Sequence, residues 1–263
     1  MNTIYIKNKY ITNIGIFNKL NGTPGIPRFE QFQSIAIKPE LNLQVPHIIH
    51  FIWIGSLLPY IYVKNILSFV ATNKDRFIYK LWVDHSTPPI DGVEIYDILT
   101  DFPIDKFINK DIYDIEKNWG SKADILRYEI VYQEGGIYSD IDAISLKPFD
   151  EIFNKSFVTY AGEPYNDLAC GFFGFPPGSR YLKYLIDCIR EVRTYSFDYS
   201  KLETKIRVPL LTGPIIFTQC FQFYNDPNIQ MISQNVTILN KDNPDAYSYH
   251  TFDSMWWDKK RLQ

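Results

Sequence analysis

The chain has 263 residues, of which 46% are hydrophobic and 16% aromatic, so it can bury a sizeable core and is not generally disordered. Its formal net charge of -3 argues against a broad nucleic-acid-binding surface, and we expect no nucleic-acid partner. Three widely spaced cysteines argue against a disulfide framework and a C-x-x-C zinc site. No run approaches the ~20 apolar residues of a transmembrane segment, and the first residues lack a signal-peptide core. We therefore expect a cytoplasmic protein, or an effector secreted by a route that the sequence does not show.

The first 44 residues show no recognisable chemistry, and residues 22–27 (GTPGIP) form a turn or a linker. We expect an N-terminal extension over residues 1–44, packed on one domain over residues 45–263. That domain begins with a run that is apolar on both faces (VPHIIHFIWIG), as in a buried parallel strand. The run ends at Trp53, where open α/β sheets bind their ligands. We expect His50 to be a buried histidine without a catalytic role.

Helix and strand patterns alternate after this first strand. Residues 59–73 predict a helix and residues 77–84 a second strand, a spacing that predicts a right-handed parallel crossover. Residues 93–99 form a short strand or helix, and residues 105–118 a helix or loop. The apolar residues expected on the buried face of the first helix are Val63, Ile66, Leu67 and Val70.

Residues 120–136 predict an amphipathic helix with one buried face. Ser121 is the expected N-cap, and Gly135 supplies the left-handed conformation that a helix end often needs. Asp124 and Arg127 are three positions apart, so they are neighbours on one helix face. The apolar residues that recur at helical spacing are Ala123, Leu126, Ile130 and Val131.

A short strand with two carboxylates follows this helix. Asp140 and Asp142 are two positions apart, so they share one face of an extended segment. Two carboxylates at the edge of an apolar core repel each other unless a cation neutralises them, and oxygen ligands suit Mg²⁺ or Mn²⁺. A D-x-D pair alone is more often a solvated turn. If the helix face packs toward the same cleft, Asp124 and Arg127 add a carboxylate and a fixed guanidinium.

The remaining segments predict further elements around this point. Residues 143–148 continue the strand, residues 157–160 and 166–175 predict two more strands, and residues 181–195 predict a helix. At residues 211–214 (LTGP), Gly213 allows a close approach of the backbone to a ligand. The following helix begins at a proline and presents free amide groups to an anion.

The combination S-K-A-D-I-L-R-Y and G-G-I-Y-S-D-I-D within residues 120–150 resembles the catalytic core of family 32 glycosyltransferases, the DXD sugar-binding group. It is also similar to the glucosyltransferase domains of large clostridial toxins. Residues 45–55, 211–214 and 247–257 resemble further motifs of these families, the last with one extra residue before its tryptophan. The resemblance implies an α/β fold of the GT-A type. Such a fold is a Rossmann-like, mixed and mostly parallel sheet with helices on both faces.

The resemblance also implies roles for individual residues. Asp140 and Asp142 would hold Mn²⁺ or Mg²⁺ against the donor phosphates, with His250 or Ser254 completing the metal shell. Arg127 would bind the donor sugar or diphosphate, and Asp124 the sugar hydroxyls. The other expected donor contacts are Trp53 on the base, Tyr138 at the ribose or phosphate, Asn166 near the sugar, Gly213 at its turn and Trp256 at the leaving phosphate.

The function implied by the resemblance is hexose transfer from a nucleotide-sugar donor, with a UDP-sugar favoured, to a hydroxyl of a glycan or protein acceptor. The resemblance implies retention of configuration. No carboxylate nucleophile stands out, so we expect front-face attack, with the leaving phosphate taking the acceptor proton. Polysaccharide biosynthesis and modification of a host protein by a bacterial effector both stay open. Two other functions stay open as well: a metal-dependent nucleotidyl- or phosphotransferase, and a pseudoenzyme that binds carbohydrate or nucleotide-sugar. A nucleotidyl- or phosphotransferase would need a phosphate-cradling loop, and the sequence contains no G-x-x-x-x-G-K-[ST] motif.

Overall fold

The computed structural model describes residues 38–161, 167–194, 198–237 and 242–253. Their centre is a seven-stranded sheet in the order β3-β2-β1-β4-β7-β6-β8. Strand β7 is antiparallel to both of its neighbours, and the other four pairs are parallel. The predicted mixed, mostly parallel sheet is confirmed. The strands are β1 (Ile48–Trp53), β2 (Ile78–Val83), β3 (Glu94–Asp97), β4 (Gly136–Ser139), β6 (Phe157–Tyr160), β7 (Leu168–Phe175) and β8 (Gln230–Ser233).

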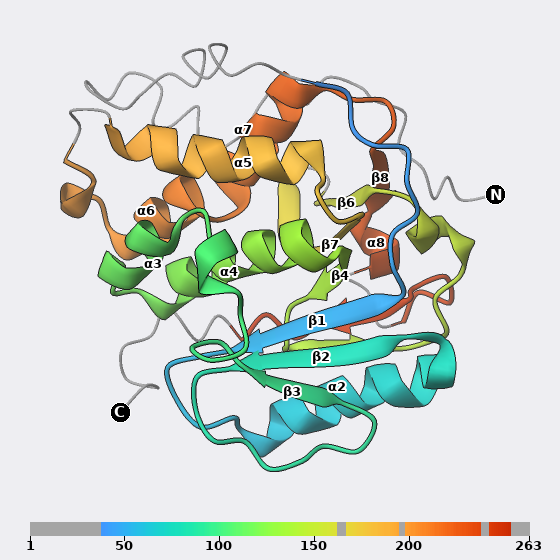
Figure 1. Ribbon diagram of the computed structural model, residues 1–263. Helices are drawn as coiled ribbons and strands as arrows, with labels where there is room; N and C mark the ends of the chain where they lie inside the picture. The colour runs from blue at the N-terminus through green and yellow to red at the C-terminus, as the bar shows by residue number, and fades with distance from the viewer. Residues whose placement is uncertain (1–37, 162–166, 195–197, 238–241, 254–263) are drawn as a thin grey trace.

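Helices cover both faces of the sheet, as predicted (Figure 1). One face carries α2 (Tyr60–Asn73), and the other carries α4 (Trp119–Glu134), α5 (Arg180–Glu191) and α7 (Pro214–Tyr224). The shorter helices are α3 (Lys110–Ile115), α6 (Thr204–Leu211) and α8 (Gln234–Thr237). Single 3-10 turns lie at Lys74–Arg76, Ile104–Lys106, Glu151–Asn154, Val192–Thr194 and Tyr199–Lys201.

Strand β1 separates two hydrophobic cores, because its side chains alternate between the two faces of the sheet. Ile49 and Phe51 pack into the core under α2, whereas Ile52 packs into the core under α4. His50 is fully buried, and its Nε2 donates to the carbonyl of Gly135 while its Nδ1 accepts from the Trp82 indole. Burial lowers the pKa of His50 to about 4, so it is a neutral structural residue, as predicted.

The buried face of α2 differs from the predicted one. Leu67 is exposed, and two asparagines are buried in its place. The Asn65 amide donates to the carbonyl of Ile141, and the Asn73 amide oxygen accepts from the backbone of Phe149. The apolar pattern could not reveal this face, because it does not mark asparagines as buried. The two amides are buried at little cost, since the backbone after β4 completes their hydrogen bonds. The side chains buried from α2 are Tyr62, Asn65, Ile66, Phe69 and Asn73.

Helix α4 begins earlier than predicted and is buried on more than one face. Asn118, instead of Ser121, is the N-cap, and its side chain accepts from the Ser121 amide. The predicted end is confirmed, since Gly135 has φ +70. The charged Asp124, Arg127 and Glu129 are buried together with the apolar residues, because α4 lies between the sheet and helices α5 and α6.

The two carboxylates do not lie on a strand, which corrects the prediction. Strand β4 ends at Ser139, and Asp140 to Asp142 form a tight turn in which the Ala143 amide donates to the carbonyl of Asp140. The next strand, β5 (Ala143–Ser145), leaves the main sheet and pairs with β9 (Ser248–His250) in a separate antiparallel ribbon. This long-range pairing, which no local pattern indicates, brings the C-terminal segment to the carboxylate turn.

The described part of the N-terminal segment is attached to α5. The carboxylate of Glu40 accepts from the backbone amides of Arg180 and Tyr181 and from the Ser179 hydroxyl. A carboxylate at a helix N-terminus satisfies free amide groups and complements the helix dipole. Residues 1–37 lie outside the described residues, and the division into residues 1–44 and 45–263 stays a prediction.

The buried Glu129 predicts a specific pH dependence of stability. It accepts from the amides of Ile108 and Asn109, and burial outweighs these bonds and raises the pKa of Glu129 to about 7. Between the ordinary glutamate pKa of about 4.3 and pH 7, the folded state therefore binds the proton more tightly than the unfolded state. The contribution of Glu129 to stability consequently falls as pH rises across this range, by on the order of 1 to 3 kcal/mol.

The Glu129→Gln variant has no carboxyl group that ionises at this position. As pH is raised from 5 to 7.5, we therefore expect the melting temperature of the wild type to decrease relative to that of the variant. Thermal unfolding of both proteins in parallel buffers measures this difference. Melting curves that shift in parallel with pH would contradict the assignment.

Candidate active site

The candidate site lies where the strand order of the sheet reverses. Strand β1 continues through α2 to β2 on one side, whereas β4 lies on the other side of β1. Open α/β sheets bind ligands at such a point, outside the carboxyl ends of the strands. Trp53 ends β1, and Asp140 directly follows β4, so both predicted residues lie at this edge.

Asp140, Asp142 and His250 converge on one point beyond the end of β4. The His250 Nε2 lies 3.2 Å from Oδ2 of Asp140 and 2.9 Å from Oδ1 of Asp142. One potential ligand atom from each of the three residues lies within 4.8 Å of the others. Both carboxylates remain partly open, with 26% and 14% of their side chains exposed. The structure therefore brings three predicted metal ligands together.

The turn that carries the carboxylates is held by hydrogen bonds to two segments, strand β7 and residues 251–253. The Asp140 amide donates to the carbonyl of Gly171 in β7. The Asp142 carboxylate accepts from the Asp253 amide, and its carbonyl accepts from both the amide and the hydroxyl of Thr251. These bonds fix the two aspartates without using all of their carboxylate oxygens.

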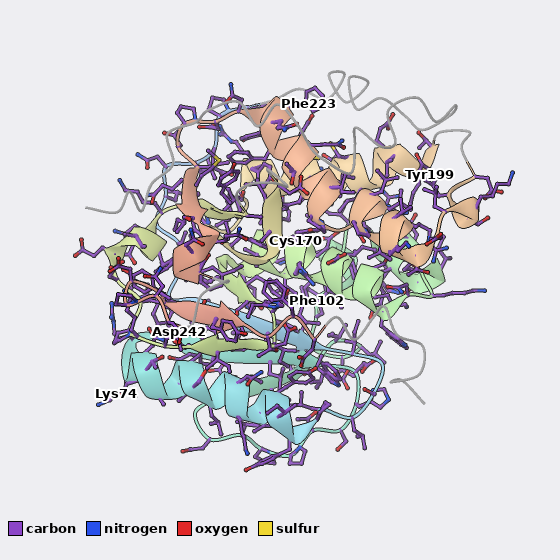
Figure 2. All side chains as sticks on the ribbon, turned by 180° about the vertical axis from the view of Figure 1, so that it is seen from behind. Lys74, Phe102, Cys170, Tyr199, Phe223 and Asp242 are labelled. Atoms are coloured by element: carbon purple, nitrogen blue, oxygen red, sulfur yellow. The ribbon has the colours of Figure 1, made fainter. Side chains whose placement is uncertain are left out.

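Arg127 is buried beside the carboxylates and interacts with two of them. Its Nη1 lies 3.2 Å from Oδ1 of Asp140, and its Nη2 lies 3.1 Å from Oδ1 of Asp124. Nη1 also donates to the carbonyl of Cys170, which lies near the middle of the molecule in Figure 2. The guanidinium lies over the Tyr138 ring, 4.5 Å from its centroid.

The charges of the site set the protonation of its members. Burial alone would raise the pKa of Asp140, but Arg127, His250 and Tyr138 together hold it below its ordinary value. For Asp124, burial wins and raises the pKa to about 6, although Arg127 and the Thr212 hydroxyl oppose it. Burial would lower the pKa of His250, but the two aspartates raise it to about 10. The site therefore attracts a cation strongly.

The donor set fits a hard divalent cation. Three carboxylates and one guanidinium leave two negative charges when His250 is neutral, and carboxylate oxygens suit Mg²⁺ or Mn²⁺. In the neutral ring, the His250 Nδ1 accepts from the Phe252 amide and the one ring proton is on Nε2, facing the aspartates. The doubly protonated ring that the raised pKa favours cannot accept this bond. Ligation by Nε2 would require the Nε2 proton to leave and the Phe252 bond to break. Ser254, the other predicted ligand, lies outside the described residues.

The other predicted donor contacts lie at varying distances from this centre. Trp53 packs on the Tyr62 ring. The Tyr62 hydroxyl donates to the Asp253 carboxylate, and the Asp253 amide donates to the Asp142 carboxylate. Tyr138 is buried, and its hydroxyl donates to Asp140. Their predicted contacts with base and ribose stay predictions, as do those of Asn166 and Trp256, which lie outside the described residues.

Gly213 is the N-cap of α7 and lies beside Asp124, as the turn motif indicated. A Cβ at this position would lie 3.4 Å from Oδ2 of Asp124. Its neighbour Thr212 was not predicted as a site residue, yet its buried hydroxyl donates to Asp124. The turn therefore supports the Asp124–Arg127 pair directly.

Gly171 is a site residue that sequence reasoning missed. A Cβ at this position would lie 2.3 Å from Oδ2 of Asp140, so only glycine leaves room for the carboxylate. The one signal in the sequence is a glycine between Cys170 and two phenylalanines in an otherwise bulky strand.

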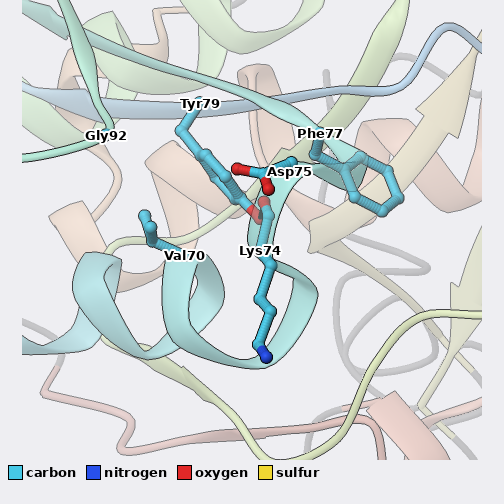
Figure 3. A pocket seen from close by; sticks show the side chains of 6 residues that line it. All are labelled: Val70, Lys74, Asp75, Phe77, Tyr79 and Gly92. Atoms are coloured by element: carbon cyan, nitrogen blue, oxygen red, sulfur yellow. Dashed lines mark hydrogen bonds between the residues drawn. The ribbon is translucent and has the colours of Figure 1, made fainter.

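A cavity of about 360 Å³ elsewhere in the molecule is not part of this site (Figure 3). It lies at the C-terminal end of α2, where Asp75 and Tyr79 point into it. Since its lining includes none of the three converging ligands, its carboxylate provides a control for the experiments below.

Gly171→Ala tests whether the position of Asp140 matters for cation binding. The added methyl group displaces the carboxylate, so we expect Mn²⁺ affinity to fall by about tenfold or more. Electron paramagnetic resonance of free Mn²⁺ during titration measures this. Gly178→Ala is the control for backbone strain alone, because Gly178 has φ +71 and a Cβ there meets nothing within 4 Å. Unchanged affinity in a folded Gly171→Ala protein would contradict the proposed position of the cation.

Comparison with known proteins agrees with this geometry. The profile of the family described as "Glycosyltransferase sugar-binding region containing DXD motif" matches residues 62–158, which include Arg127 and both carboxylates. Two solved structures share the fold: the PaToxG glycosyltransferase (TM-score 0.56, 21% identity, 78% of this chain and 79% of that one) and the UDP-bound glycosyltransferase domain of the YGT toxin (0.57, 11%, 72% and 80%).

Curated relatives match over parts of their length. Subversion of eukaryotic traffic protein A of Legionella pneumophila is 31% identical over 125 residues, 42% of this chain and 19% of that protein. Inositol phosphoceramide mannosyltransferase 3 of Schizosaccharomyces pombe is 26% identical over 174 residues, 66% of this chain and 44% of that protein. The chain thus spans less than half the length of either relative. No helix in the described part of the chain is long and apolar enough to cross a membrane.

The predicted GT-A type fold is confirmed, and residues 62–158 match the model of the family of glycosyltransferase sugar-binding regions that contain the DXD motif.

Proposed function

We propose that this protein is a retaining glycosyltransferase that uses Mn²⁺ or Mg²⁺ to transfer a hexose from a nucleotide-sugar to an acceptor hydroxyl. The observation that carries the proposal is the convergence of Asp140, Asp142 and His250 beside the buried Arg127. This cluster lies at the sheet edge where α/β proteins bind nucleotides. The matching family profile supports the same reaction class.

The names of similar proteins support the proposed donor, the transferred group and the acceptor. One solved neighbour is a UDP-bound glycosyltransferase domain, which supports a UDP-sugar as the donor. The Schizosaccharomyces pombe relative is named a mannosyltransferase, which supports a hexose as the transferred group. The Legionella relative is named for the subversion of eukaryotic traffic, which supports a role as an effector acting on a host acceptor. Transfer to a glycan in polysaccharide biosynthesis is the other acceptor class that the proposal includes.

Different residues of the site have different roles in the proposed reaction. Asp140 and Asp142 would hold the cation, which when bound supplies charge stabilisation for the departing diphosphate. Asp124 accepts from hydroxyls of the donor sugar, and Arg127 keeps Asp140 ionised and offers positive charge to the sugar or diphosphate. With no carboxylate nucleophile assigned, the acceptor attacks from the face that the diphosphate leaves, and the leaving phosphate takes its proton.

Asp140→Ala and Asp142→Ala test the reaction. Removal of either cation ligand is expected to lower the rate of nucleotide-sugar hydrolysis with Mn²⁺ by on the order of a thousandfold. Asp75→Ala, in the cavity of Figure 3, is the matched control and should keep the wild-type rate. Full activity of the Asp142→Ala protein in the presence of a chelator would refute the proposal. An inactive wild type that still binds the donor would favour the pseudoenzyme alternative.

The nucleotide is tested by thermal protection. UDP- and GDP-sugars are added with Mn²⁺, and the ligand that binds the folded state raises the melting temperature according to its concentration and affinity. We expect larger protection by UDP-sugars, and loss of that protection in Asp142→Ala. Stronger protection by a GDP-sugar would correct the donor assignment, whereas protection by nucleoside triphosphates alone would favour a nucleotidyl- or phosphotransferase.

A further inference from the structure

A second cavity, of about 350 Å³, borders the candidate site on the side of α3 and α6. Leu211 lines it and directly precedes Thr212, whose hydroxyl binds Asp124. Glu116 also lines it, just before the N-terminus of α4, and its charge adds to those that raise the pKa of Asp124. Tyr199, labelled in Figure 2, is another lining residue. The cavity is thus linked to Asp124 through the residue next to Thr212 and through the charge of Glu116, and none of the candidate metal ligands lines it.

The cavity has a surplus of positive charge. Lys117, Arg193 and Arg207 line it, and Glu116 is the one acidic residue in its lining. The Glu116 carboxylate is already engaged, because it accepts from the amides of Lys117 and Asn118. With all groups ionised, the lining carries two net positive charges.

These three cations differ from their neighbours in having no carboxylate partner in the described part of the chain. On the same helical layer, Lys110 pairs with Asp114, Lys183 with Asp187, and Arg190 with Asp111. Three surface cations close to the cavity thus have acidic partners. The unpaired cations are gathered around one concave site.

Arg193 adds an unsatisfied buried donor. Its Nη1 donates to the carbonyl of Ile189, whereas its Nη2 is buried and has no hydrogen-bond partner among the described residues. Burial lowers the pKa of Arg193 to about 10, which reflects the cost of keeping this charge away from water. A guanidinium fork binds a phosphate or carboxylate through paired N–H groups, which would satisfy the free donor.

We propose that this cavity binds a phosphate group of the acceptor, next to the hydroxyl that receives the sugar. This inference rests on the proposed transferase function. A phosphate monoester carries close to two negative charges at neutral pH and so balances the lining, whereas a carboxylate would leave one positive charge uncompensated. The position beside Thr212 and Asp124 places such an acceptor against the sugar-binding side of the site.

The test measures phosphate binding directly, in EDTA, so that the candidate metal site takes no part. The probes are inorganic phosphate and glycerol 3-phosphate, with glycerol as the uncharged comparison, and affinity is measured by calorimetry. We expect the wild type to bind both phosphates and not glycerol. Arg193→Gln and Arg207→Gln should each weaken binding by about tenfold, the loss of one charge-assisted contact. Arg76→Gln removes an arginine at the far end of α2 and should bind like the wild type.

Vesicles distinguish the source of the phosphate. Retention on phosphatidylcholine vesicles that contain phosphatidic acid, lost in Arg207→Gln, assigns the group to a lipid headgroup. Binding of glycerol 3-phosphate without retention on these vesicles assigns it to a soluble acceptor. Both outcomes support the site, whereas no binding of any phosphate by the wild type overturns it.

Equal affinity of the wild type and a folded Arg207→Gln protein also overturns the inference. Because Arg193 is partly buried, its variant is interpreted only with an unchanged melting temperature, and the accessible Arg207 supplies the decisive comparison. The proposed function is tested separately by donor hydrolysis without acceptor. The wild type alone decides that test, so a failed phosphate site and a failed transferase assignment give different results.

Discussion

The buried guanidinium of Arg127 is the interaction on which the candidate site depends. A charge away from water is stable only when it is paired and its hydrogen bonds are satisfied. Arg127 meets this requirement through Asp124 on its own helix, Asp140 after β4 and the carbonyl of Cys170 in β7. Arg127 therefore joins α4, the turn after β4 and the later strand β7. These contacts of Arg127 contribute to the burial of α4 on more than one face.

The same pairing leaves negative charge on the side of the site that faces solvent. Arg127 compensates one carboxylate charge, but Asp140 and Asp142 lie together around His250. The negative charge of the two carboxylates raises the pKa of His250 and so favours its protonated form. A divalent cation would bind between the same carboxylates and compete with that proton. The small ribbon of β5 and β9 makes this possible, because it carries His250 back to the turn after β4.

Charge is distributed unevenly on the two sides of Asp124. One side holds the acidic cluster at the end of β4, and the other holds the basic cavity between α3 and α6. Thr212 and Gly213 lie at the boundary, close to the Asp124 carboxylate. A reaction that moves a sugar between two substrates needs separate places for donor and acceptor. In the proposed reaction, the acidic cluster would serve the donor and the basic cavity the acceptor.

The sequence by itself determined most of the secondary elements that bury apolar residues, and it predicted which residues carry the chemistry. The apolar run of β1, the glycine end of α4 and the D-x-D pair were all readable, because local patterns reflect local backbone preferences and burial. Only the tertiary structure decided the turn at Asp140, the pairing of β5 with β9 and the room that Gly171 leaves for a carboxylate. It also decided which cations stay unpaired at the basic cavity. These features depend on contacts between segments that lie far apart in the chain, and no local spacing encodes such contacts.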